Sequence, residues 1–262
     1  MSSIPGFWEG GPHDPIPVEW SWREFVRSAG GEVVEDLLPK PRTFENADFL
    51  FRAFPMVVEL KEVETEFGRS SAVRDGFQAL IGRLMQEEPN WHPTLLGGAG
   101  DYPKWFVSEF VRLFRPPISR ILKKANRQIR GTKAHFAISE PTGMLVFVND
   151  GFTQLEPHFV RALASDLLAN SYSSIDCFLY MTVNRYVEVG GSNVPRLVWA
   201  PLYSERATDS LVELVDDLGR KWFEYLETKI GPFSTPREEV PQGKGSAGTI
   251  LSRSIVLPQE NR

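Results

Sequence analysis

Residues 46–63 have the sequence NADFLFRAFPMVVELKEV, and the interpretation of the whole chain depends on them. Two apolar segments, 47–54 and 56–63, have the composition of β-strands, and the link between them is short enough for a hairpin. Glu59 and Lys61 lie two residues apart on the second segment. A strand would therefore point both side chains to the same face of a sheet.

An antiparallel hairpin would also place the Asp48 carboxylate beside Glu59, so that two acids and an amine meet at one margin of a sheet. Mg²⁺ prefers oxygen ligands and is often held by one or two carboxylates together with a substrate phosphate. A lysine beside such a metal can orient a water and offset charge on the phosphate. The pattern favours a metal-dependent phosphodiesterase site. The alternative is a simple ion pair between Glu59 and Lys61 on a half-solvated edge strand.

Periodic apolar residues on both sides of the hairpin predict further helices and strands. A helix over 20–38 precedes the hairpin, and Gly30-Gly31 is a point where it can break. The elements expected after the hairpin are helices 70–86, 105–114 and 118–131 (the last started by Pro116-Pro117), strands 134–139 and 144–149, helix 156–170, strand 175–183, edge strand 195–201 and helix 205–230. This mixture predicts an α/β protein with a central mixed β-sheet flanked by helices.

The pattern of Asp48, Glu59 and Lys61 on two adjacent apolar strands resembles the PD-(D/E)xK nuclease superfamily, also called the restriction-endonuclease-like fold. The order helix, hairpin, helix and strand is also similar to the core of that family. The resemblance covers residues 20–183 and treats 66–117 as a helical insertion. It implies that Asp48 and Glu59 bind the metal and that Lys61 is catalytic. No proline precedes Asp48, which is a departure from the family's pattern.

The resemblance implies roles for residues outside the hairpin as well. Many members of the family add an acid from the first helix, and Glu35 is the preferred match, with Glu32 second. Many also carry a polar or basic residue on the helix that follows the motif. Lys124 and Gln128, four residues apart and so on one helix face, would supply it. The helix over 70–86 is the alternative candidate for that core helix.

Basic residues concentrate in one part of a chain whose net charge is −5. Between 112 and 133 there are eight basic residues and no acid: Arg112, Arg115, Arg120, Lys123, Lys124, Arg127, Arg130 and Lys133. A basic stripe beside an acidic pocket suits an enzyme that holds a polyanion next to bound cations. The residues expected to bind nucleic acid are Lys123, Lys124, Arg127, Gln128 and Arg130. The alternative for the stripe is a solvated helix face.

Length and composition predict one globular domain, because the chain has 262 residues, of which 42% are hydrophobic. We expect an irregular N-terminal arm over 1–18, a single α/β domain over 19–231 and a flexible C-terminal tail over 232–262. The tail is expected because it is polar and contains few large apolar residues.

The chain has neither a signal-peptide pattern nor a run of about 20 apolar residues, so a cytoplasmic protein without membrane contact is expected. Cys177 is the one cysteine, and its apolar neighbours favour a buried, structural thiol. The four histidines lack the spacing of a zinc site. No P-loop and no dinucleotide-binding motif is present.

These features predict a nuclease that uses Mg²⁺, or Mn²⁺, to hydrolyse DNA, with RNA as the second choice of substrate. Nucleases of this type often pair to cut two strands, so a homodimer is compatible with the resemblance. The alternative is a catalytically inactive module of the same architecture that serves binding or assembly, which the acidic net charge favours. An α/β enzyme acting on small molecules finds no supporting motif.

Overall fold

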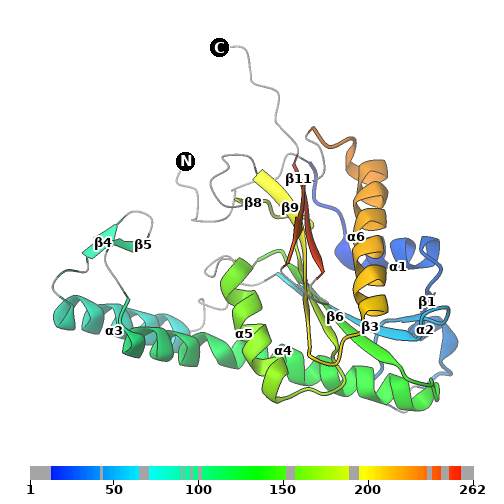
Figure 1. Ribbon diagram of the computed structural model, residues 1–262, viewed down its shortest axis with the longest axis horizontal. Helices are drawn as coiled ribbons and strands as arrows, with labels where there is room; N and C mark the ends of the chain where they lie inside the picture. Colours follow the sequence, from blue (N-terminus) through cyan, green and yellow to red (C-terminus); the bar gives the residue numbers. More distant parts are fainter. Residues whose placement is uncertain are drawn as a thin grey trace.

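The computed structural model has one mixed β-sheet at its centre, with helices on both faces (Figure 1). It describes residues 13–41, 44–64, 71–88, 90, 92–94, 97–99, 102–151, 157–188, 195–234, 238–242 and 248–254. Within these residues nine strands form the sheet in the order β1-β2-β3-β6-β7-β9-β11-β10, and β8 pairs with β9 outside this order. Their bounds are β1 Glu32–Val33, β2 Phe49–Phe51, β3 Met56–Val63, β6 Thr142–Asn149, β7 Cys177–Met181, β8 Val187–Glu188, β9 Pro195–Tyr203, β10 Glu238–Pro241 and β11 Thr249–Ser254. Strands β4 (His92–Thr94) and β5 (Gly97–Ala99) form a separate pair.

The central strands β3, β6 and β7 run parallel to one another. Residues 144–148 of β6 and 177–181 of β7 are entirely apolar or aromatic and have no exposed surface. Such runs are typical of parallel strands that are covered on both faces. The flanking strands pair antiparallel, β2 with β3 and β9 with β7. The predicted α/β fold with a central mixed sheet flanked by helices is confirmed.

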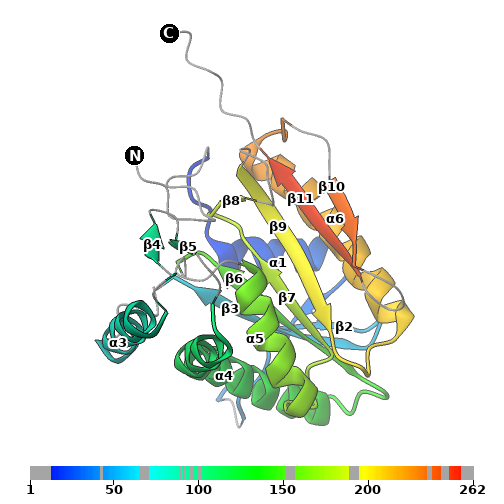
Figure 2. The ribbon, with the colours of Figure 1, turned by 60° about the vertical axis from the view of Figure 1, so that its left-hand side comes forward.

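The helices within the described residues are α1 Val18–Ser28, α2 Val34–Leu37, α3 Ser71–Glu87, α4 Lys104–His135, α5 Pro157–Asn170 and α6 Asp209–Ile230. Helices α1 and α6 cover one face of the sheet, and α4 and α5 cover the other (Figures 1 and 2). On the first face the Trp22 ring stacks on Trp199 and on Trp222, at 6.1 and 5.2 Å between centroids. On the second face Ile118, Leu122 and Ile129 of α4 belong to the same core cluster as Val57 of β3. None of these helices combines the length and the apolar character that a membrane crossing requires.

Two helix ends follow from local sequence. The helix expected over 20–38 ends at Ser28, and Gly30 takes a φ of 85°, which glycine adopts without strain. The chain then forms β1 and the short α2 in place of a longer helix. Helix α6 begins after Thr208, whose hydroxyl accepts a hydrogen bond from the Leu211 N–H at 3.3 Å.

Helix α4 is continuous over 32 residues although Pro116 and Pro117 lie inside it. The prediction of separate helices over 105–114 and 118–131 is wrong. Each proline removes one helical hydrogen bond. Phe114 and Ile118, on either side of the prolines, are buried in the same core cluster, and this packing stabilises the continuous helix. The N-terminal part of α4 packs with α3 and projects beyond the sheet (Figure 1).

Residues 134–139, expected as a strand, end α4 and form a turn. The Phe136 N–H still donates to the Thr132 carbonyl at 3.1 Å, and Ala137 has a φ of 47°. Strand β6 therefore has no hairpin partner here and pairs with β3 and β7.

The flexible tail expected over 232–262 is wrong for two segments, because 238–241 and 249–254 form β10 and β11. Strand β11 pairs with β9, so β9 lies inside the sheet and is not the edge strand expected over 195–201. Leu251 alone brings a large, fully buried side chain to the core from β11, which explains why composition missed the strand. The domain thus extends to Ser254. Residues 1–12 of the expected arm lie outside the described residues.

Candidate active site

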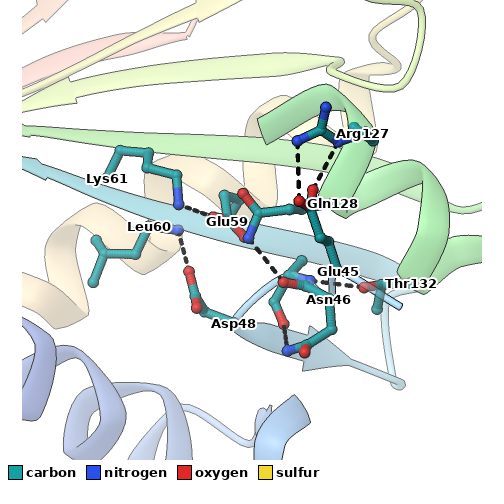
Figure 3. A network of polar contacts seen from close by, with 10 residues as sticks. Glu45, Asn46, Asp48, Glu59, Leu60, Lys61, Arg127, Gln128 and Thr132 are labelled. Carbon is teal, nitrogen blue, oxygen red and sulfur yellow. Dashed lines mark hydrogen bonds and ion pairs between the residues drawn. The ribbon is translucent and has the colours of Figure 1, made fainter. Parts of the chain in front are cut away.

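The approach to β2 fixes Asp48 next to β3 (Figure 3). The Asp48 N–H donates to the Val58 carbonyl at 3.1 Å, and the Asp48 carbonyl accepts from the Val34 N–H at 2.9 Å. The Asp48 carboxylate accepts a hydrogen bond from the Leu60 N–H at 2.8 Å. The backbone and the side chain of Asp48 are therefore both held against β3.

Glu59 and Lys61 lie on the same face of β3, as predicted. The Lys61 ammonium forms an ion pair with Glu59 Oε1 (Figure 3). The Glu59 side chain has no exposed surface, whereas 23% of the Lys61 side chain is exposed. No donor among the described residues reaches Glu59 Oε2. One oxygen of this wholly buried carboxylate therefore meets the Lys61 ammonium, and the side chain is also close enough to Asp48 to share a proton with it.

Burial raises the pKa of both acids of the site. Burial, followed by the negative charge of Asp48, raises the pKa of Glu59 to about 8, although Lys61 acts in the opposite direction. Burial also raises the pKa of Asp48, against the hydrogen bond from the Leu60 N–H and the charge of Lys61. Two ionised carboxylates at this position repel each other in a poorly solvated site, and a bound cation would relieve that repulsion.

Glu35, the acid expected from the first helix, lies on α2 and lines a cavity of about 260 Å³ together with Asp48. Its carboxylate accepts a hydrogen bond from Arg23 at 2.8 Å, and Arg23 also contacts Glu19 on the same cavity wall. Glu32, the second match, forms an ion pair with Arg52 at 2.6 Å. Of these two acids, Glu35 is the one that the structure brings to a common cavity with Asp48.

Helix α4 holds the three residues that precede Asp48. The Arg127 guanidinium makes two hydrogen bonds to the Glu45 carboxylate, at 2.7 and 3.1 Å (Figure 3). The Gln128 side-chain amide donates to the Asn46 carbonyl at 2.9 Å. The Thr132 hydroxyl accepts a hydrogen bond from the Ala47 N–H at 2.8 Å. The expected nucleic-acid contacts Arg127 and Gln128 thus have partners within the chain.

Lys123, Lys124 and Arg130, the other residues expected to contact nucleic acid, are exposed and have no ion pair among the described residues. Thr132 was not singled out by the sequence. It follows Gln128 by four residues, which puts both on one helix face, but a threonine in a basic helix is no signal by itself.

Removing the Thr132 hydroxyl is expected to loosen this attachment. Thr132 and Ala47 have no exposed surface, so Thr132→Val leaves a buried N–H without an acceptor at a cost of about 1–3 kcal/mol. Amide hydrogen exchange should show lost protection at Ala47 in Thr132→Val and retained protection in Thr132→Ser, which keeps the hydroxyl. Equal protection in the two variants would contradict the role given to the hydroxyl.

No group of three His, Cys, Asp or Glu side chains in the described part of the chain is arranged to hold a metal ion. The candidate ligands are therefore the pair Asp48 and Glu59, with substrate and water oxygens completing a coordination shell. Cys177 is buried within β7, and burial raises the pKa of its thiol. This agrees with the structural role expected for it.

Comparison of the chain with protein-family models, with curated proteins and with solved structures finds no match in any of the three.

Proposed function

We propose that this protein is a metal-dependent nuclease in which Asp48 and Glu59 bind Mg²⁺ or Mn²⁺ and Lys61 assists phosphodiester hydrolysis. The observation that carries the proposal is the buried Glu59 carboxylate, which has Lys61 on one oxygen, no described donor on the other and the Asp48 charge nearby. A buried acid in this situation is costly to a fold without a use for it.

The residues present fit a hard divalent cation. They supply two carboxylates, one of which has a buried oxygen without a donor, and Mg²⁺ is commonly held by one or two carboxylates plus substrate phosphate. When bound there, such an ion supplies a Lewis acid for a phosphoryl oxygen and lowers the pKa of a coordinated water.

The chain's own residues have distinct parts in this proposal. The Leu60 N–H holds the Asp48 carboxylate in one orientation, so the ligand is positioned before substrate arrives. The partly exposed Lys61 ammonium can orient a water and offset charge on the phosphoryl oxygens. Glu35, held by Arg23, lies on the same cavity as Asp48 and adds negative charge there.

The order of elements also supports the resemblance to the restriction-endonuclease-like fold. Helix α1 is followed by the antiparallel strands β1, β2 and β3, with the short α2 between β1 and β2. Helix α3, the β4–β5 pair and α4 come next, and β6 then pairs parallel to β3. The resemblance favours DNA over RNA and allows a homodimer that cuts two strands. A free cysteine that needs no oxidising compartment agrees with a cytoplasmic location.

Cleavage of mixed DNA and RNA substrates, with and without Mn²⁺, tests the proposal directly. We expect cleavage that depends on the metal, is stronger on DNA, and is absent in Glu59→Gln because one carboxylate ligand is lost. Gln is nearly the same size as Glu, so folding is expected to survive, and circular dichroism checks it. Metal-dependent cleavage by Glu59→Gln at the wild-type rate would refute the assignment.

A catalytically inactive binding or assembly module is the second candidate. The observation that favours it is the Lys61 ammonium, which contacts Glu59 Oε1 without any metal. This candidate predicts that calorimetric titration with Mg²⁺ or Mn²⁺ gives no binding heat and that no substrate is cut.

A further inference from the structure

A groove of about 610 Å³ lies between α3 and the N-terminal part of α4, outside the candidate active site. Its walls include the apolar residues Val73, Leu80, Leu113 and Pro117. Its charged lining consists of Arg83, Arg112, Arg120 and Glu109, so three arginines face one acid. The groove therefore combines an apolar floor with a positive rim.

The rim is continuous with the basic stripe of α4. Six exposed basic residues of this helix fall within an arc of about 120° at 3.6 residues per turn: Arg112, Arg120, Lys123, Lys124, Arg127 and Arg130. Arg112 and Arg120 belong to both the stripe and the groove. From Arg112 to Arg130 the stripe spans about 27 Å, since a helix rises about 1.5 Å per residue. Its other end lies beside the site, where Arg127 contacts Glu45 (Figure 3).

The arginines of the rim can exchange their present ion pairs for contacts with a ligand at little cost in free energy. Arg112 is 79% exposed and pairs only with Glu109 on its own helix among the described residues. Arg120 has no ion pair in the described part of the chain. Arg83 pairs with Glu87 and lies over the Trp105 ring at 4.1 Å. Exposed pairs of this kind contribute about 0–1 kcal/mol, so a polyanion can replace them.

From this continuity we propose that the groove between α3 and α4 binds one strand of nucleic acid, with phosphates on Arg112 and Arg120, and leads it along α4 toward Asp48 and Glu59. The inference rests on the proposed function and adds a binding site to it. The volume of the groove is that of a pocket for a molecule of drug size, which fits a few nucleotides of a single strand and not a duplex. At about 3.4 Å per nucleotide of a fully stacked strand, the stripe spans at most about 8 nucleotides.

Fluorescence anisotropy with a labelled 10-nucleotide single-stranded DNA in EDTA, titrated with salt, tests the site without any cleavage. The test variant is Arg112→Gln/Arg120→Gln. The matched control is Arg27→Gln/Arg74→Gln, which removes the same charge from two exposed arginines that pair with Asp36 and Asp75 outside the groove. Losing two phosphate contacts should reduce the slope of log K against log salt by about 1.4. If the wild type and the variant bind the strand equally at 1 M salt, the variant binds it about 25-fold more weakly at 0.1 M salt.

The control variant is expected to keep its affinity within about twofold, because neither of its arginines touches the strand. Equal slopes for the wild type and the groove variant would overturn the inference. So would tighter binding of an acidic helical peptide than of the DNA strand, which would assign the groove to a protein partner. A protein that binds the strand through Arg112 and Arg120 but cuts nothing with Mn²⁺ would refute the proposed nuclease and leave the groove assignment standing.

Discussion

Replacing Lys61 with methionine is expected to slow metal-dependent cleavage by about 10²–10³-fold, the usual cost of removing one charge-stabilising group from an active site. The Lys61 side chain is partly exposed, and its ammonium is adjacent to the fully buried Glu59. Methionine keeps most of the side-chain volume and removes the charge. Metal binding should persist, since both carboxylates remain and a competing cation has gone.

Single-turnover cleavage at saturating substrate and calorimetric titration with Mn²⁺ separate these two effects. Lys221→Met is the matched control, because Lys221 is an exposed lysine on α6 that pairs with Asp217. Its cleavage rate should equal that of the wild type. If Lys61→Met also cleaves at that rate, Lys61 has no catalytic part and its role is limited to the ion pair.

Glu59→Gln is expected to be more stable than the wild type at alkaline pH, in addition to being inactive. The pKa of Glu59 is raised from 4.5 to about 8, first by burial and then by Asp48. Between these two values the folded protein holds a proton that the unfolded chain has released. The unfolding free energy of the wild type therefore falls by about 1.4 kcal/mol per pH unit across this window. The total is roughly 3–5 kcal/mol, and the Glu59→Gln variant would not lose it because its amide does not ionise.

Urea unfolding in EDTA from pH 5 to pH 9 measures this difference. The two proteins should be similar near pH 5, where Glu59 is protonated, and should diverge until about pH 8. Glu213→Gln, which removes an exposed carboxylate of α6, should follow the wild type within about 0.5 kcal/mol throughout. Parallel curves of unfolding free energy against pH for the wild type and Glu59→Gln would show that the pKa of Glu59 is not raised in the folded protein.

The sequence predicted the elements that are apolar and local. Strand β3 was predicted at its observed bounds, and the α3 helix was predicted within a residue at each end, because a repeating apolar pattern marks both. The errors have a physical cause in tertiary packing. The core that spans Pro116-Pro117 holds α4 together across two prolines, and pairing with β9 orders β11, whose own residues carry little apolar signal.

For the candidate site, the strand period was enough to predict that Glu59 and Lys61 share a face. Glu35, which was preferred to Glu32, lines a cavity together with Asp48, and its part in a site stays a prediction. The attachment of 45–47 to α4 could not be predicted, since it depends on where a distant helix packs and not on any local pattern. Gln128 and Arg127 were expected to face a ligand, whereas part of their hydrogen-bonding capacity is used within the chain.

The order of strands across the sheet follows the order of the chain almost without exception, from β1 at one margin to β10 and β11 at the other. A ribosome releases the chain in that same order, so each new strand can be added to a margin that already exists. Asp48 and Glu59 are therefore synthesised before α4 and β6, the elements that hold the segments around them in the sheet.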